Sequence, residues 1–133
     1  MRVAISGASG FIGNALVKYC KSLKYEIKIL SSNPDIFLPD VEIFKLDKDN
    51  PETSELESFF ENVDIFFNCL GEVNNEKKMN RVNIEFTKLF IDIATRKNLK
   101  KWVQLSSVGA YGTPKSGNVN ETYSDSPLNL YEK

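Results

Sequence analysis

The stretch Gly7-Ala8-Ser9-Gly10-Phe11-Ile12-Gly13 follows a short apolar run and opens an amphipathic segment. A glycine-rich turn between a strand and a helix is the arrangement that binds the pyrophosphate of a dinucleotide. We expect Gly7 to turn the chain off the strand, Gly10 to leave room for the pyrophosphate, and Gly13 to let the helix pack close to the sheet. Free N–H groups and the positive dipole end of the helix would then face the phosphates.

This glycine pattern is GxxGxxG, which is one residue longer at its first gap than GxGxxG. Three glycines alone would be a weak signal, and a glycine-rich turn without a ligand is the alternative. The position of the stretch at a strand-to-helix junction near the N-terminus favours a dinucleotide-binding loop.

Five segments are predicted to be strands, because their apolar residues alternate or form short continuous runs. They are residues 2–6, 26–30, 41–46, 65–70 and 102–105. Strands that alternate with helices imply right-handed crossovers and a parallel sheet. The sequence therefore predicts an α/β fold, a Rossmann-like, doubly wound parallel sheet of about five strands with helices on both faces. Residues 1–133 are expected to form a single NAD(P)-binding domain.

Three segments repeat apolar residues at helical spacing. The stripe of the first comprises Ile12, Ala15, Leu16, Tyr19, Cys20 and Leu23. The second helix is expected to begin with Asn50 as N-cap and Pro51 as its first residue. Its apolar face comprises Leu56, Phe59, Phe60 and Val63. The third is a long helix with an apolar face of Met79, Val82, Phe86, Leu89, Phe90 and Ile93. Residues 31–40, 73–78 and 109–129 are predicted to be loops.

The composition excludes several classes of protein. Hydrophobic residues make up 41% of the 133, enough for a core, and the net charge of -1 argues against a basic nucleic-acid-binding surface. No apolar run is long enough to span a membrane and none resembles a signal peptide, which predicts a cytoplasmic protein without a membrane partner. Without histidine there is no Ser-His-Asp triad and no histidine metal site, and Cys20 and Cys69 form no CxxC pair, so no metal site is predicted.

Three segments downstream of the glycine loop also carry candidate cofactor-binding residues. Asp47 follows the third strand, Phe66-Phe67-Asn68-Cys69-Leu70-Gly71 forms the fourth, and Asn83 lies on the long helix. Together with GASGFIG they resemble the extended short-chain dehydrogenases/reductases, which include NAD(P)-dependent sugar-nucleotide epimerases, dehydratases and reductases. The resemblance covers almost the whole chain and implies NAD or NADP as cofactor. The residues implied to bind it are Gly7, Ser9, Gly10, Phe11, Ile12, Gly13, Ser31, Ser32, Asp47, Leu70, Gly71 and Asn83.

Some of these residues keep an alternative interpretation. Asp47 matches the acid that contacts the adenine, but it can instead only cap a turn. Asn83 matches the family's structural and active-site Asn, but it can instead only bridge backbone groups. Ser31-Ser32-Asn33 stands where NAD-using members carry an acid that binds the ribose hydroxyls. Without that carboxylate a 2′-phosphate meets no repulsion and two hydroxyls can bind it, which favours NADP over NAD.

A second motif of the resemblance carries the chemistry. Ser106-Ser107-Val108-Gly109-Ala110-Tyr111-Gly112 is similar to the family's SSxxxYG segment, with Ser107 at its catalytic Ser/Thr. Pro127 and Tyr131 match the Pro and the catalytic Tyr of the P-x-x-x-Y-x-x-x-K signature. In the family the Tyr takes a proton from a substrate hydroxyl, the Ser or Thr hydrogen-bonds the reacting oxygen, and hydride moves to the nicotinamide. The resemblance implies an NAD(P)-dependent oxidoreductase or epimerase that acts on a sugar nucleotide or a related hydroxyl or carbonyl substrate.

The match stops before the signature is complete. The chain ends at Lys133, two residues short of the position of the family's Lys, so Tyr131 has no adjacent activator. Two residues on a helix do not return a side chain to the same face, so Lys133 does not replace that Lys. We expect this chain to be the N-terminal part of a longer protein whose C-terminal substrate domain is absent, and we expect no turnover by the chain alone.

Two rival functions remain on sequence grounds. The first rival is a non-catalytic NAD(P)-binding module that senses redox state, and the second is a structural interaction domain with an empty glycine loop. A sheet with an unpaired edge strand and exposed apolar surface favours self-association, so a homo-oligomer is expected.

Overall fold

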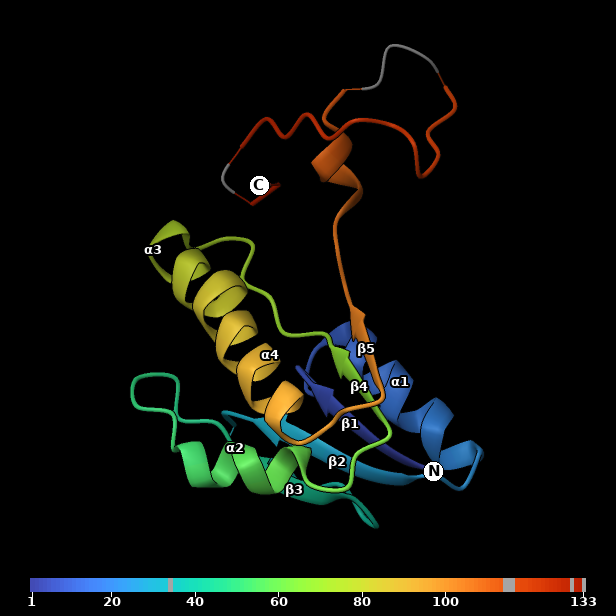
Figure 1. Cartoon of the computed structure of the whole chain (residues 1–133), viewed down its shortest axis with the longest axis vertical. Coiled ribbons are helices and arrows are strands. Elements are labelled where there is room, and N and C mark those ends of the chain that lie inside the picture. The colour runs from blue at the N-terminus through green and yellow to red at the C-terminus, as the bar shows by residue number, and fades with distance from the viewer. Residues whose placement is uncertain (34, 114–116, 130, 133) are drawn as a thin grey trace.

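The computed structural model describes residues 1–33, 35–113, 117–129 and 131–132. The prediction for Lys133, and the predicted loops 31–40 and 109–129 at residues 34 and 114–116, therefore lie outside the described residues. Its strands are β1 (Arg2–Ser6), β2 (Glu26–Ser31), β3 (Glu42–Lys45), β4 (Ile65–Asn68) and β5 (Lys101–Gln104). They form one five-stranded sheet in the order β3-β2-β1-β4-β5, and all neighbouring pairs are parallel (Figure 1). The predicted Rossmann-like α/β fold is confirmed. Because the strand order reverses beside β1, a crevice opens at the carboxyl ends of β1 and β4.

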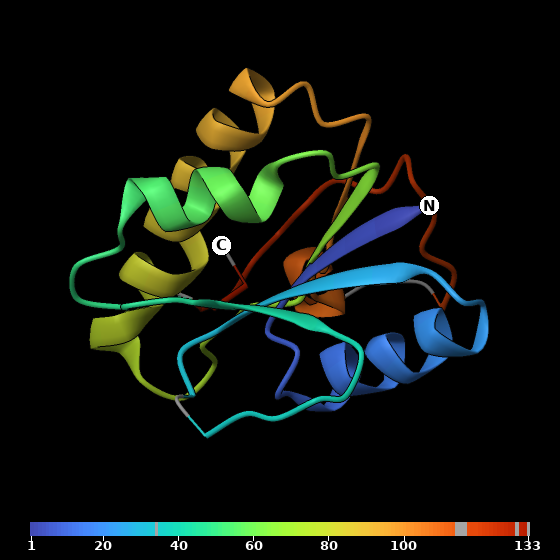
Figure 2. The same ribbon diagram turned by 90° about the horizontal axis from the view of Figure 1, so that it is seen from below.

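Helices cover both faces of this sheet. They are α1 (Phe11–Ser22), α2 (Thr53–Phe60), α3 (Glu76–Met79), the π-helix η1 (Asn80–Glu85), α4 (Phe86–Arg96) and the 3-10 helix η2 (Val108–Tyr111). Figure 2 shows α1 against one face of the sheet and α2 with α4 against the other. None of the helices in the described part of the chain combines the length and the apolar character that crossing a membrane requires.

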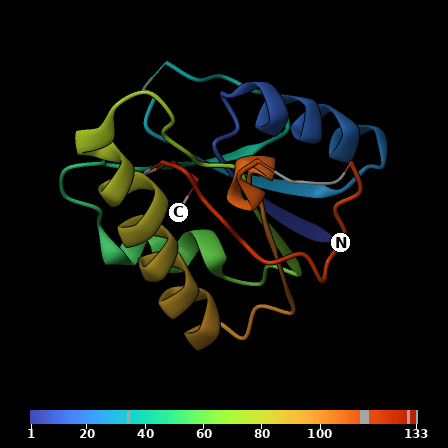
Figure 3. The same cartoon turned by 90° about the horizontal axis from the view of Figure 1, so that it is seen from above.

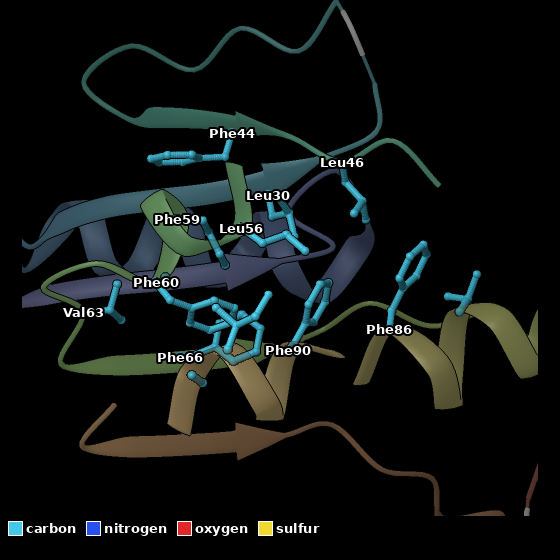
Figure 4. Packing of buried hydrophobic residues seen from close by; sticks show 14 residues of the cluster. Leu30, Phe44, Leu46, Leu56, Phe59, Phe60, Val63, Phe66, Phe86 and Phe90 are labelled. Atoms are coloured by element: carbon cyan, nitrogen blue, oxygen red, sulfur yellow. The ribbon is translucent and has the colours of Figure 1, made fainter. Parts of the chain in front are cut away.

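A cluster of aromatic side chains fills the layer between the sheet, α2 and α4 (Figure 4). Phe66 of β4 lies at its centre, with edge-to-face contacts to Phe60 at 4.9 Å and to Trp102 at 4.7 Å between ring centroids. A second, smaller cluster lies under α1 and includes Val17 and Ile29. Both faces of the central strands are therefore buried, as continuous apolar strands predict.

The inward face of α1 agrees with the predicted stripe at Leu16 and Cys20 and differs from it at other positions. The buried residues of the helix are Gly13, Val17 and Cys20, whereas Ile12 and Tyr19 of the predicted stripe are 49% and 62% exposed. The helix is rotated because Gly13 packs directly on the backbone of the glycine loop, which turns the residues four and seven positions later toward the sheet. Apolar residues on the opposite side of α1 therefore remain exposed.

The start of α2 also differs from the prediction. The helix begins at Thr53 with Glu52 at its N-cap position, so Asn50 and Pro51 precede it. The backbone N–H of Asn50 donates instead to Asp47 Oδ1 at 3.1 Å. Asn50 thus belongs to a turn that Asp47 organises, and this turn delays the helix.

The third helical region begins earlier than predicted. Asn75 caps its N-terminus by accepting a hydrogen bond from the Lys78 N–H at 3.3 Å, so α3 occupies part of the predicted 73–78 loop. The π-helical turns of η1 then join α3 to α4, a local widening that the apolar periodicity did not predict. A single 3-10 turn, η2, lies at the start of the predicted 109–129 loop.

Asp64 connects three strands through hydrogen bonds at the amino-terminal edge of the sheet. Its carboxylate accepts hydrogen bonds from the Lys100 ammonium and from the Arg2 N–H, the latter at 2.9 Å. The Lys100 hydrogen bond, followed by that from Arg2, holds the pKa of Asp64 below its usual value. A carboxyl whose folded-state pKa is depressed stabilises the fold above its unfolded pKa of about 3.9, and this contribution is lost as the pH falls through the folded value.

We therefore expect acid to lower the Tm of the wild type more steeply than that of Asp64→Asn below about pH 4. Thermal unfolding followed by circular dichroism between about pH 7 and pH 3 measures this difference. Asp35→Asn, at an exposed loop position, is the control and should keep the wild-type pH dependence. Parallel Tm profiles for Asp64→Asn and the wild type would contradict the assignment.

Candidate cofactor and active site

The glycine loop begins with a backbone conformation that requires glycine. Gly7 has a φ of +67°, and a Cβ at this position would lie 2.5 Å from the carbonyl oxygen of Cys69. The chain thus turns off β1 while touching the backbone at the end of β4. The predicted turning role of Gly7 agrees with this geometry.

The other two glycines differ in what surrounds them. The Gly10 N–H donates to the Gly7 carbonyl at 3.0 Å, and a Cβ on Gly10 would meet only that oxygen, at 3.3 Å. A Cβ on Gly13 would lie 2.3 Å from the same oxygen, so only a residue without a side chain fits there. Gly10 is the N-cap of α1 and makes no side-chain hydrogen bond to the first turn, which leaves that turn's N–H groups open to an anion.

A groove of about 190 Å³ lies against the loop, and we call it the glycine-loop groove. The ends of β1, β2 and β4, together with residues that follow β3, contribute to its walls. Seven of the predicted cofactor-binding residues line it: Gly7, Ser9, Gly10, Ser31, Ser32, Leu70 and Gly71. The structure therefore brings together residues that are far apart in the sequence.

A larger cavity of about 520 Å³ lies beside this groove, and we call it the Ser107–Tyr131 cavity after two of the residues that line it. Asn83 lines it as well. Cys69, Leu70 and Gly71 line both spaces. The groove and the cavity thus adjoin at the residues that follow β4, and we call the two together the cleft.

The segment after β5 contributes to the walls of the Ser107–Tyr131 cavity. In Figure 1 the chain leaves β5, passes through η2 and continues over the carboxyl ends of the strands. Figure 3 looks down on the same segment, which lies over the sheet between α1 and α4. The two cavity-lining residues predicted to be catalytic, Ser107 and Tyr131, belong to this segment.

Four predicted cofactor-binding residues line neither space: Phe11, Ile12, Gly13 and Asp47. The Phe11 side chain is 93% exposed, so this residue and Ile12 can contact a phosphate only through their backbone N–H groups. Asp47 accepts hydrogen bonds from the N–H groups of Asn50 and Asp49, which hold the pKa of its carboxyl below the usual value. This geometry is that of a turn cap, and an adenine contact by Asp47 stays a prediction.

Asn83 projects from η1 and holds the peptide of Glu72. Its Oδ1 accepts from the Glu72 N–H at 2.8 Å, and its Nδ2 donates to the Glu72 carbonyl at 3.0 Å. Both polar atoms of the side chain are therefore engaged with one backbone unit, which follows directly after Gly71. Asn83 bridges backbone groups and at the same time fixes the floor of the cleft.

The Ser107 hydroxyl keeps its proton available. Ser107 is the N-cap of η2, and its Oγ accepts a hydrogen bond from the Gly109 N–H at 3.1 Å. An oxygen that accepts from the backbone can still donate its own hydrogen to a second partner. Tyr131 is 39% exposed and lines the same cavity, so the two side chains face a common space.

Comparison with known proteins identifies the family of this chain. A model of the NAD dependent epimerase/dehydratase family matches residues 3–133. The chain belongs to this family. No curated protein sequence matches the chain significantly.

Solved structures share the fold of this chain. A short-chain dehydrogenase/reductase superfamily protein from Agrobacterium tumefaciens with bound NAD matches with a TM-score of 0.86 at 18% identity, over 99% of this chain and 41% of that one. UDP-glucose 4-epimerase from Thermotoga maritima, with UDP-glucose, matches with a TM-score of 0.86 at 18% identity, over 99% and 47%. Uronate dehydrogenase from Agrobacterium tumefaciens, a Y136A mutant complexed with NAD, matches with a TM-score of 0.84 at 17% identity, over 98% and 50%. The chain thus spans at most half the length of these three proteins, and at such identities the likeness shows the fold.

Sequence reasoning missed several residues of the cleft. Cys69 lines both parts of it, and burial raises the pKa of its thiol. Lys48 lines the glycine-loop groove, and Asp125 lines the Ser107–Tyr131 cavity. A signal existed for Cys69 and Lys48, because each lies just beyond the end of a parallel strand, where ligands bind in this fold.

A polar network that is buried at Ser6 and Asn68 and exposed at Gln104 supports the floor of the cleft. The Ser6 hydroxyl donates to Asn68 Oδ1 at 2.6 Å, and Asn68 Nδ2 donates to Gln104 Oε1 at 3.0 Å. These side chains come from the last residues of β1, β4 and β5. The network therefore holds the three strand ends at one level beneath the cleft.

Proposed function

We propose that residues 1–133 form the cofactor-binding domain of an NAD(P)-dependent oxidoreductase or epimerase that acts on a sugar nucleotide or a related hydroxyl or carbonyl substrate. The observation that carries this proposal is that the glycine-loop groove adjoins the cavity lined by Ser107 and Tyr131, with three lining residues in common. The names of the matched structures, which include NAD and UDP-glucose, support it. Their greater length supports a C-terminal substrate domain in the full-length protein.

Different residues along the cleft bind different parts of the cofactor. The loop backbone and the open N–H groups of α1 bind the pyrophosphate, and Ser31 with Ser32 binds the ribose at the far end. Leu70 and Gly71 would contact the nicotinamide part of a bound cofactor, and Asn83 fixes the backbone that follows them. A bound nicotinamide cofactor supplies the hydride acceptor or donor.

Residues of the Ser107–Tyr131 cavity carry out the proton transfer. The Tyr131 phenol exchanges a proton with the substrate hydroxyl or carbonyl oxygen. The Ser107 hydroxyl donates a hydrogen bond to the same oxygen and orients it. Tyr131 and Ser107 therefore act on the substrate, whereas the glycine loop only binds the cofactor.

Titration of the chain with NADH and with NADPH tests the proposal. Trp102 is the only tryptophan of the chain, so its emission is a specific donor for energy transfer to a bound reduced nicotinamide. We expect saturable binding with a Kd in the micromolar range, typical of enzyme ligands. Absence of saturable binding for both nucleotides would contradict the proposed function.

A further inference from the structure

The glycine-loop groove carries a positive charge at one end. Lys48 is the single charged residue among those that line the groove. Ser31 stands at the end of β2, where a carboxylate would bind the ribose of NAD. The walls described for this groove thus hold one cation and no anion.

The carboxylate that precedes Lys48 in the chain forms no ion pair with it. Asp47 precedes Lys48, but its Oδ1 accepts from the N–H groups of Asp49 and Asn50, at 2.9 and 3.1 Å. Within the described residues, no carboxylate lies close enough to Lys48 to form an ion pair. The Lys48 ammonium is therefore available to an external anion.

The backbone of Lys48 is held in place while its side chain is exposed. The Lys48 and Asp49 carbonyls accept from the Arg81 guanidinium, each at 3.4 Å. Arg81 itself pairs with Glu85 at 2.7 Å, so its charge is already compensated on η1. The cation that remains for a ligand is that of Lys48.

The strand pairing places Lys48 near two hydroxyl groups. The Leu46 N–H donates to the Ser31 carbonyl at 2.8 Å, which joins the chain after β3 to the end of β2. Ser31 Oγ accepts from the Asn33 N–H at 3.1 Å and can still donate its proton. Ser32 follows it, is exposed, and also lines the groove.

We propose that Lys48, together with the Ser31 and Ser32 hydroxyls, binds the 2′-phosphate of NADP(H) and makes this chain prefer NADP(H) over NAD(H). A phosphate monoester needs a cation and several hydrogen-bond donors, and this end of the groove offers both. Because the groove must take a dinucleotide for this to hold, the inference rests on the proposed function.

The test compares nucleotide affinities of the wild type and Lys48→Met. We expect the wild type to bind NADPH at least about tenfold more tightly than NADH, the size of one charge-assisted hydrogen bond. Lys48→Met should lose about tenfold in NADPH affinity and change NADH affinity less than about twofold. Lys101→Met is the matched control, because Lys101 is exposed at the amino end of β5, away from the groove, and it should change neither affinity.

Two further measurements isolate the contribution of the 2′-phosphate to binding. In competition with NADPH, 2′,5′-ADP should bind the wild type more tightly than 5′-AMP, and Lys48→Met should remove this difference. Raising the salt concentration should weaken NADPH binding more than NADH binding. Equal wild-type affinities for NADPH and NADH, or equal losses of both in Lys48→Met, would overturn the role of Lys48 and leave the proposed function standing. Failure of both nucleotides to bind would overturn the proposed function together with it.

Discussion

Gly13→Ala is expected to destabilise the fold by about 3 kcal/mol, the upper part of the range for overpacking a close contact. Alanine in a helix is ordinarily about 1 kcal/mol more favourable than glycine, so the expected sign is the reverse of the usual one. The reason is geometric, because the new Cβ would lie 2.3 Å from the Gly7 carbonyl oxygen and 2.9 Å from Ala8 Cα. Both neighbours are backbone atoms and can move only if α1 lifts from the sheet.

Thermal unfolding measures this effect as a decrease of about 10 °C in Tm for a chain of this size. Gly117→Ala is the control, because a Cβ at Gly117 would meet no atom within 4 Å. Its Tm should stay within about 2 °C of the wild-type value. If Gly13→Ala melts at the wild-type temperature, α1 does not need its close approach to the glycine loop.

The same contact explains why the sequence predicted α1 but only part of its inward face. Apolar residues occur on two sides of this helix, and counting them included Ile12 and Tyr19, which are exposed. The predicted close packing of Gly13 already pointed to Val17, four residues later, which the predicted stripe left out, and to Cys20, which the stripe contained. A steric requirement at one glycine outweighs the number of apolar residues.

The boundaries of the helices were harder to predict than their existence. Asn50 and Pro51 are favourable residues for a helix start, yet the Asp47 carboxylate takes the Asn50 N–H and extends the turn. The residue at which this turn ends and the helix begins depends on where β3 ends and where α2 packs, and neither is visible in single-residue preferences.

The cleft was predictable to the extent that strand order was predictable. Parallel strands place their carboxyl ends along one edge, which is why the glycine loop, Ser31 and Gly71, which the resemblance implied to bind one cofactor, lie together there. The role of Lys48 in the groove depends on the register of β2 against β3, in which Ser31 pairs with Lys45. Register depends on the packing of side chains from several elements, so it is not predictable from one segment of sequence at a time.

Gly10→Asp is expected to reduce nucleotide affinity more than a hundredfold while the chain stays folded. Gly10 lines the groove, and a Cβ there would meet only the Gly7 carbonyl oxygen, at 3.3 Å. A carboxylate about 5 Å from one phosphate charge costs about 3 kcal/mol at an effective dielectric constant of about 20. That energy corresponds to a loss of more than about a hundredfold in affinity.

Gly10→Asn separates charge from size, because asparagine has the shape of aspartate without its charge. Asparagine should lose affinity only through the space that it occupies, so we expect its loss to be about tenfold smaller than that of aspartate. Gly117→Asp adds the same charge far from the groove lining and should bind as the wild type does. Equal losses for Gly10→Asp and Gly10→Asn would show that Gly10 is required only for space. Unchanged affinity in Gly10→Asp, in a variant that keeps its Tm, would mean that the pyrophosphate does not lie against this loop.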